Sequence, residues 1–302
     1  MMNGILYVDK PRGMTSHDVV AAVRRLTGVR AVGHTGTLDP DASGLLLLCI
    51  GQATKFARFF EALDKTYWAV MRLGIVSDTQ DATGNVLQRY EVPSLTTVQL
   101  EAVFKQFTGQ VQQTPPMYSA VKHRGQRLYR LARQGRTVLR QSRQVCIRNL
   151  RLLDVRDDLV TLSVTCSKGT YVRTLCADIG EVLGCGAHTV HLQRCKIGAV
   201  CVAQAYTLDA LQRLARCGNI ARVLTSLARA LEFLPALCVT SQQYRALQMG
   251  QASTLSTLLA RLSTLSSQAF SYRLRTQLEG TFAVIHRQTS HSERWKLSYL
   301  ER

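Results

Sequence analysis

The chain has 302 residues, of which 46% are hydrophobic, and lysine plus arginine outnumber aspartate plus glutamate by 38 to 20. This length and apolar content argue against disorder and predict one large folded domain with room for a small one. The longest strongly apolar run, residues 45–50, is far shorter than the roughly 20 residues that cross a bilayer. We therefore expect no membrane anchor. Because Asp9 and Lys10 stand where a signal peptide would be apolar, we also expect a cytoplasmic location.

The formal charge of +18 is the first functional signal. So large an excess of cations favours a polyanionic partner such as nucleic acid, although a merely soluble basic surface would give the same composition. The 9 cysteines include no Cys-x-x-Cys pair, and several of them fall inside apolar runs. This pattern predicts reduced cysteines in the core and neither a disulfide framework nor a zinc site.

The first part of the chain alternates short apolar segments with polar loops. An apolar strand is expected at residues 5–8. Thr15 to Asp18 then offer a hydroxyl cap and a first-turn acid, which predict a helix that ends at Gly28. A polar, glycine-rich loop (33–44) leads into the apolar strand 45–50. Further on, the hydrophobic patterns predict a strand at 67–73 and a helix at 98–107.

A break at Thr114-Pro115-Pro116 precedes a basic stretch from Lys122 to Arg143. The patterns beyond it predict strands at 145–147, 160–166 and 280–285, and helices at 170–183 and 210–231. Leu234-Pro235 suits a domain boundary, and the Ser/Thr/Leu-rich segment 252–268 reads as a degenerate helix or a flexible insert. Strands and helices without regular alternation predict an α+β fold with a mixed sheet.

Asp39 is the first candidate for chemistry, because it lies in a glycine-bounded loop directly before a buried strand. A turn-capping role before Pro40 explains the same residue at least as well, and His34 has a similar alternative. Arg173, at a strand-to-helix junction, could hold a carboxylate ionised, or it could be one more surface arginine. A tyrosine at a strand start, such as Tyr67, more often packs in the core.

Several common catalytic patterns are missing from the sequence. It contains no Gly-x-x-x-x-Gly-Lys phosphate loop, no nicotinamide-binding fingerprint and no serine nucleophile elbow. A metal-dependent nuclease using His34, Asp39 and Asp41 is conceivable, but sites for hard cations usually gather more carboxylates. The residues alone therefore indicate a nucleic-acid-binding protein with a candidate aspartate site, and they leave the reaction open.

The loop Gly33-His34-Thr35-Gly36-Thr37-Leu38-Asp39-Pro40, followed by Ser43-Gly44-Leu45-Leu46, is one of several strings that occur in a familiar order. The others are Val8-Asp9-Lys10-Pro11, Gly13-Met14-Thr15-Ser16, Lys65-Thr66-Tyr67, Arg72-Leu73-Gly74, Asp78-Thr79-Gln80-Asp81-Ala82-Thr83-Gly84, Pro115-Pro116-Met117-Tyr118-Ser119-Ala120-Val121-Lys122, Gly125-Gln126-Arg127-Leu128-Tyr129, Lys168-Gly169-Thr170-Tyr171-Val172-Arg173, Leu183-Gly184-Cys185-Gly186-Ala187-His188 and Leu192-Gln193-Arg194. Together they span about residues 4–200, and the set resembles the TruB family of bacterial tRNA pseudouridine-55 synthases.

The resemblance implies a pseudouridine synthase fold, with a mixed, mainly antiparallel sheet around a central cleft. It implies isomerisation of a uridine in the T loop of transfer RNA, without cofactor or metal, after the base has been turned out of the loop. Asp39 would attack uracil C6 or ribose C1′, or act on the sugar as a base in an elimination. Each route breaks the N1 glycosidic bond, rotates the uracil and rejoins it through C5.

The family pattern also implies roles for further residues. Arg173 matches the salt-bridge partner of the catalytic aspartate, and Tyr67 would stack on the uracil and help to remove the C5 proton. His34 matches a residue that fills the space left by the base. The remaining matches are Tyr171 and Leu192, which would line the uridine pocket, Lys10, which would lie near it, and Asp81, an acid in the cleft.

For domains, we expect a catalytic domain at 1–234 with an RNA-clamping insertion at about 110–143 that orders on RNA binding. Residues 235–302 would form a small PUA-like RNA-binding module, either complete or reduced, because the Ser-Thr-Leu stretch matches the family poorly. The expected partner is the T stem-loop of transfer RNA, bound by a monomer that has no membrane or metal partner. The main alternative is a non-catalytic transfer-RNA-binding or refolding chaperone of the same fold.

Overall fold

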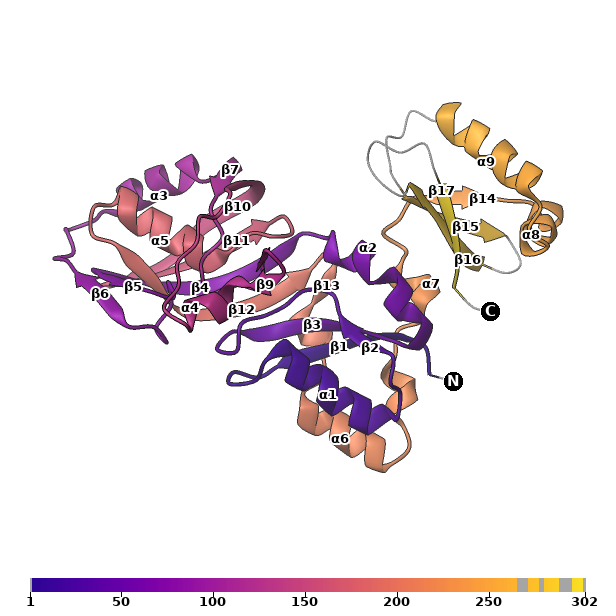
Figure 1. Cartoon of the computed structure of the whole chain (residues 1–302), viewed down its shortest axis with the longest axis horizontal. Helices are drawn as coiled ribbons and strands as arrows, with labels where there is room; N and C mark the ends of the chain where they lie inside the picture. Colours follow the sequence, from indigo (N-terminus) through magenta and orange to yellow (C-terminus); the bar gives the residue numbers. More distant parts are fainter. Residues whose placement is uncertain (1, 265–270, 277–279, 288–294, 301–302) are drawn as a thin grey trace.

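The computed structural model describes residues 2–264, 271–276, 280–287 and 295–300. It confirms the α+β class: a large mixed sheet carries helices on its surfaces, and a small sheet with its own helices follows at the C-terminal end (Figure 1). In the part of the chain described, no helix is long and apolar enough to cross a membrane.

The large sheet has the strand order β1-β3-β12-β4-β11-β10-β7, and β2 and β13 pair with β3 and β12. Its neighbours are antiparallel except β3 and β12, which run parallel and pair only through Gln193–Ser43 and Arg194–Gly44. We call β1, β2 and β3 the first half of the sheet, and β12, β4, β11, β10 and β7 the second half. The strands are β1 (Gly4–Lys10), β2 (Val32–His34), β3 (Ser43–Ile50), β4 (Lys65–Leu73), β7 (Gly109–Gln113), β10 (Arg143–Arg156), β11 (Leu159–Cys166), β12 (Ala187–Ile197) and β13 (Val200–Cys201).

The first half is covered by α1 (Ser16–Thr27), beside which α6 (Leu208–Arg216) packs (Figure 1). Thr15 caps α1 and forms a capping box with Asp18, and Gly28 ends it with φ +69°, a conformation that glycine adopts without strain. Its Val19, Val20 and Val23 pack against β1 and β3. The expected helix at the start of the chain is therefore confirmed.

The second half is covered by α3 (Thr97–Gln106) and α5 (Val172–Val182), which share its largest apolar core. That core joins the inward residues of β4 and β11, among them Met71 and Leu162, to the apolar faces of both helices. Burial of this surface fixes α5 on the sheet and so fixes the orientation of its first turn. Shorter elements follow the chain between these layers: η1 (Gly51–Phe56), α2 (Ala57–Glu61), β5 (Ile75–Ser77), β6 (Val86–Arg89), η2 (Val202–Gln204), η3 (Ile220–Val223) and α7 (Leu227–Ala230).

Between β7 and β10 the chain leaves the sheet over residues 114–142, which we call the clamp segment. It contains a small hairpin, β8 (Lys122–His123) and β9 (Gln126–Arg127), and the short helix α4 (Leu128–Ala132). Leu128 and Leu131 are buried and anchor it, while most of its arginines are exposed. Residues 110–113, which we had expected in the insertion, belong to β7 instead.

A second, four-stranded sheet with the order β14-β15-β16-β17 forms the C-terminal part of the chain (Figure 1). It has a core of its own that includes Leu237, Leu274 and Ile285. Val284 and Leu300 pack instead with Phe56 and Phe59 of the large domain. The elements are β14 (Ala236–Cys238), α8 (Ser241–Gln248), α9 (Ala252–Thr264), β15 (Ser271–Thr276), β16 (Gly280–Arg287) and β17 (Trp295–Tyr299).

Three sequence expectations differ from the structure. The strand β12 was not predicted, and β10 extends well beyond the expected 145–147. The expected helix 210–231 is divided into α6, η3 and α7, because Gly218 takes φ +69° and ends the first segment. The segment that began at 252 is helical as far as Thr264, and residues 265–268 lie outside the described residues.

Candidate active site

Asp39 lies in the loop between β2 and β3, and the backbone on either side of it is held in place. Buried Ser16 of α1 accepts a hydrogen bond from the Leu38 amide at 2.8 Å, and its hydroxyl lies 3.1 Å from the Leu38 carbonyl. On the other side, Lys10 of β1 donates to the Pro40 carbonyl at 3.1 Å. The loop is thus fixed both to the helix α1 and to the strand β1.

Arg173, in the first turn of α5, meets the Asp39 carboxylate side-on. Its Nε lies 2.8 Å from Oδ2, and its Nη2 donates to Oδ1 at 3.3 Å. The arginine side chain is 5% exposed, whereas that of Asp39 is 38% exposed. The carboxylate is therefore held by a buried cation on one side and remains open on the other, where a substrate atom could approach it.

A second carboxylate, that of Asp81, shares the same guanidinium. Nη1 of Arg173 lies 3.2 Å from Asp81 Oδ2, and it also donates to the Thr79 carbonyl at 2.6 Å. Nη2 donates to the Tyr118 carbonyl at 2.8 Å. The other Asp81 oxygen accepts from the Thr79 and Thr83 hydroxyls at 2.7 and 2.6 Å. A buried arginine needs such partners, because an unpaired buried charge is costly.

Lys10 is a fully buried cation directly beneath the Asp39 loop. Its ammonium group donates to the carbonyls of Pro11, Met14 and Pro40 at 2.9, 2.7 and 3.1 Å. Burial lowers the pKa of Lys10 to about 8, and the nearby negative charge of Asp39 opposes that shift. The lysine thus contributes both a structural tie and a positive charge next to the candidate carboxylate.

Tyr67 lies on β4 and pairs in register with Arg194 of β12. Burial raises the pKa of the Tyr67 hydroxyl, and the charge of Asp39 adds to that shift, while the charge of Arg194 and its hydrogen bond to the phenol oppose it. Leu192 pairs with Ala69, so its nearly buried side chain shares one face of the sheet with the Tyr67 ring. The ring and the leucine together offer an apolar surface.

His34 ends β2, and its Nδ1 accepts a hydrogen bond from the Gly36 amide at 3.3 Å. Burial lowers the pKa of His34, and the positive charges of Arg194 and of Arg127 act in the same direction. The imidazole is therefore neutral at neutral pH, with its proton on Nε2. Because Arg127 belongs to the clamp segment, this effect also shows that the clamp segment lies within electrostatic range of His34.

Tyr171 caps the start of α5, two positions before Arg173. It is locked by Gln113 of β7, whose side chain accepts from the Tyr171 amide at 2.7 Å and donates to its carbonyl at 3.0 Å. The guanidinium carbon of Arg143 lies 5.0 Å from the centroid of the Tyr171 ring. The cation–π contact fixes this ring at the mouth of the clamp segment.

The structure thus brings Asp39, Arg173 and Asp81 into direct contact, and it ties Lys10 to them through the Pro40 carbonyl. Tyr171 lies two residues before Arg173, and Leu192 lies two residues before Arg194. In the described part of the chain, neither contacts Asp39 directly. Asp41 turns to Arg12, whose guanidinium binds both carboxylate oxygens. Among the described residues, no three His, Cys, Asp or Glu side chains gather as metal ligands would.

Comparisons with known proteins agree with this geometry. A model of the TruB family pseudouridylate synthase N-terminal domain matches residues 24–172, and one of the tRNA pseudouridylate synthase B C-terminal domain matches residues 173–232. A tRNA pseudouridine synthase B from Chromohalobacter salexigens is 44% identical over 264 residues, which cover 87% of this chain and 86% of the relative. The chain belongs to the TruB family. It is therefore a pseudouridine synthase, an isomerase.

A second relative supports this assignment to the TruB family, and a solved structure supports the fold. A tRNA pseudouridine synthase B from Stutzerimonas stutzeri is 49% identical over 213 residues, 70% of each chain. A chain in the crystal structure of a Cbf5-Nop10-Gar1 complex matches 99% of this chain and 83% of its own, with a TM-score of 0.67 and 22% identity. At that identity the structural match speaks for the fold alone. It extends the pseudouridine synthase fold over nearly the whole TruB-family chain.

Two residues of this TruB-family site were missed as functional candidates in the sequence. Arg194 is 1% exposed and hydrogen-bonds to both flanks of the Asp39 loop. Ser16 was expected only as part of the helix start, whereas its hydroxyl also holds the Leu38 amide. The available signal was the string Leu192-Gln193-Arg194, but in a chain this basic a single arginine does not stand out.

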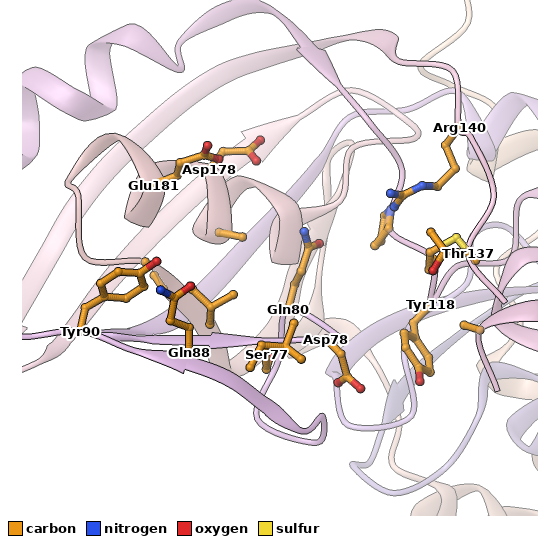
Figure 2. A pocket seen from close by; sticks show the side chains of 18 of the residues that line it. Ser77, Asp78, Gln80, Gln88, Tyr90, Tyr118, Thr137, Arg140, Asp178 and Glu181 are labelled. Carbon is orange, nitrogen blue, oxygen red and sulfur yellow. The ribbon is translucent and has the colours of Figure 1, made fainter. Parts of the chain in front are cut away.

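A cavity of about 720 Å³ lies next to the site, but Asp39 does not line it (Figure 2). It is bounded by the β5–β6 hairpin, the clamp segment and α5, with Asp178 and Glu181 on one wall and Arg140 on another. It adjoins the site through Tyr118, whose carbonyl accepts from Arg173. None of the site residues predicted from the sequence lines this cavity.

Proposed function

We propose that this enzyme isomerises uridine-55 in the T loop of transfer RNA to pseudouridine. Its curated relatives carry the name tRNA pseudouridine synthase B, and a net charge of +18 suits a phosphate-rich substrate. The observation that carries the chemistry is the Asp39–Arg173 ion pair, in which a half-exposed carboxylate is held by a buried guanidinium.

Asp39 is proposed as the catalytic carboxylate. An ionised oxygen is needed whether it attacks uracil C6, attacks ribose C1′ or removes a proton from the sugar. Arg173, whose Nε lies 2.8 Å from the Asp39 carboxylate, would hold that oxygen in place. Asp81 is proposed to keep the guanidinium in place through its own hydrogen bonds to Thr79 and Thr83.

The other candidate residues are proposed to receive the uridine. Tyr67 and Leu192 would contact the flat faces of the turned-out uracil ring, and Tyr67 would assist removal of the C5 proton. Tyr171, fixed by Gln113, would line the same pocket. His34, neutral and partly buried, would occupy the space that the base leaves in the T loop. Lys10 would support the loop from below.

RNA contacts outside the site are proposed for two parts of the chain. The clamp segment presents several exposed arginines, one of which, Arg127, lies within electrostatic range of His34, and phosphates of a bound T loop would lie there. The C-terminal sheet is proposed as a PUA-like module that contacts RNA beyond the T loop, with the catalytic domain ending near residue 234. We further propose that the enzyme acts as a monomer in the cytoplasm.

The test uses an isolated T-arm stem-loop and a matched RNA in which only position 55 is changed to cytidine. After incubation with the full-length enzyme, pseudouridine is located by chemical labelling and primer extension. We expect modification at position 55 of the first RNA and none in the second. Modification at another uridine, or reaction with complete transfer RNA only, would contradict the proposed substrate.

A further inference from the structure

The two halves of the large sheet meet at a narrow junction that lies inside the proposed site. Parallel strands β3 and β12 pair there only through Gln193–Ser43 and Arg194–Gly44. Asp39 belongs to the first half, whereas Tyr67 on β4 and Arg173 on α5 belong to the second. The placement of the carboxylate against the uracil-binding ring therefore depends on how firmly these halves are joined.

Arg194 bridges that junction with its side chain. The guanidinium donates to the Leu45 carbonyl at 2.7 Å and to the Gly36 carbonyl at 3.0 Å, so that it grips the Asp39 loop on both flanks. On its own side of the junction it stands directly opposite Tyr67 in the pairing of β12 with β4, close enough for its charge to lower the pKa of the Tyr67 hydroxyl. One planar, multidentate group thus connects the loop that carries Asp39 to the ring that faces the substrate.

The backbone at this point is equally close. Gly44 has φ +100°, and a Cβ atom there would lie 2.4 Å from the Arg194 carbonyl oxygen, so only glycine fits. The contact lets the two strands approach closely enough for the arginine to reach across. The glycine and the arginine act as one structural unit at the centre of the site.

Burial of the Arg194 charge costs more free energy than a purely structural role requires. Arg194 is 1% exposed, and the ion pairs of the described residues do not include it. Two further buried cations, Lys10 and Lys65, are close enough for its charge to lower their pKa values. Apolar residues usually serve a packed core at least as well as a buried charge whose partners are carbonyl dipoles.

We propose that Arg194 is a positioning residue that sets the distance between the Asp39 loop and the Tyr67 ring. The inference rests on the proposed roles of Asp39 and Tyr67, and it adds a third residue through which both act. A displacement of about 1 Å between reacting groups is enough to slow a reaction by about 100-fold. Loss of Arg194 therefore slows the chemical step far more than it weakens RNA binding.

The experiment compares the full-length enzyme with Arg194→Met and Arg194→Lys. We expect the single-turnover rate at saturating T-arm RNA to fall by about 100-fold in Arg194→Met and by about 10-fold in Arg194→Lys, which keeps one of the donors. The RNA dissociation constant, measured in an Asp39→Asn background, changes by less than about threefold. The control is Arg24→Met, an exposed arginine that donates to the Val32 carbonyl at 2.8 Å, with a rate within about twofold of wild type.

A double-mutant comparison with Tyr67→Phe distinguishes a positioning role of Arg194 from a general role in stability. If Arg194 acts through the ring, Arg194→Met costs much less in a Tyr67→Phe background, whereas fully additive losses overturn the proposal. Should Arg194→Met fail to fold, Arg194→Lys decides: a wild-type rate overturns the inference. If the wild-type enzyme is active, Asp39→Asn is inactive and Arg194→Met reacts at the wild-type rate, this inference alone fails. An enzyme that does not modify position 55 defeats the proposed function.

Discussion

The carboxylate of Asp39 and the guanidinium of Arg173 lie 2.8 Å apart across the two halves of the sheet, although the residues are 134 positions apart in the chain. The loop that carries Asp39 is fixed by α1 and β1, and the helix that carries Arg173 is fixed by the largest apolar core. The pair therefore depends on the whole fold. Burial of the arginine shields its side of the pair from water, and exposure of the aspartate leaves its carboxylate accessible.

Arg173→Ala is predicted to lower the pseudouridylation rate by about 1000-fold, because the active carboxylate loses the cation that holds it in place. RNA affinity should stay within about threefold, since the proposed partners of Arg173 are carboxylates and not phosphates. The single-turnover rate and the dissociation constant are measured on the same T-arm RNA. The control is Arg72→Ala, which breaks a surface ion pair with Asp158 at 3.1 Å. Equal losses of rate and affinity would count against this role.

Lys10 provides a prediction about pH. Its pKa is lowered to about 8 in the folded protein, from the ordinary 10.5. Below pH 8 both the folded and the unfolded states bind the proton, and the cost of burying the charge is fully present. Between pH 8 and 10.5 the unfolded state binds more protons, so this group makes the free energy of unfolding rise with pH, by at most about 1.4 kcal/mol per unit.

This contribution is measured as a difference, because other groups titrate in the same range. The free energy of unfolding of wild type relative to Lys10→Met, from urea titrations, should increase between pH 8 and 10.5. Lys55→Met is the control, since Lys55 is exposed, and its difference from wild type should stay flat. A flat difference for Lys10→Met as well would show that the buried ammonium is not destabilised as described.

The clamp segment is predicted to gain order when RNA binds. Few of its side chains are buried, Leu128 and Leu131 among them, while arginines such as Arg130 and Arg133 are exposed. Amide hydrogens of residues 122–142 should exchange at least about tenfold more slowly in complex with a T-arm RNA. Amides of α1 serve as the internal control and should not change. Equal protection of the clamp segment with and without RNA would contradict the prediction.

Much of the fold follows from local signals. The strands β1, β3 and β4 and the helices α1, α3 and α5 have strong apolar periodicity or clear caps, and all of them form where expected. β12 was missed because its polar residues, among them His188-Thr189 and Gln193-Arg194, break the regular alternation that marks a strand. Two of those polar residues, His188 and Arg194, are in fact buried. Tertiary contacts, which local patterns do not contain, decide such cases.

The site is less accessible to residue-level reasoning. Asp39 alone suits a turn before proline, and Arg173 alone suits a basic surface; only the resemblance to the TruB family linked them. Their contact depends on how the two halves of the sheet join through β3 and β12, which no short segment specifies. Arg194 was missed for the same reason. In a chain with 38 lysines and arginines, a buried arginine is recognisable only by its three-dimensional partners.

The most direct test of the account is to compare Asp39→Asn with Asp41→Asn, two positions further along the same loop. Asp41 is also an aspartate, but Arg12 binds both of its oxygens at the surface. Pseudouridine at position 55 of a T-arm RNA is measured under single-turnover conditions, with RNA binding and transfer-RNA refolding assayed in parallel. The account predicts no detectable pseudouridine with Asp39→Asn, unchanged RNA binding, and a rate within about threefold of wild type for Asp41→Asn. Pseudouridine formation by Asp39→Asn at the wild-type rate would contradict it and would leave the refolding chaperone as the better description.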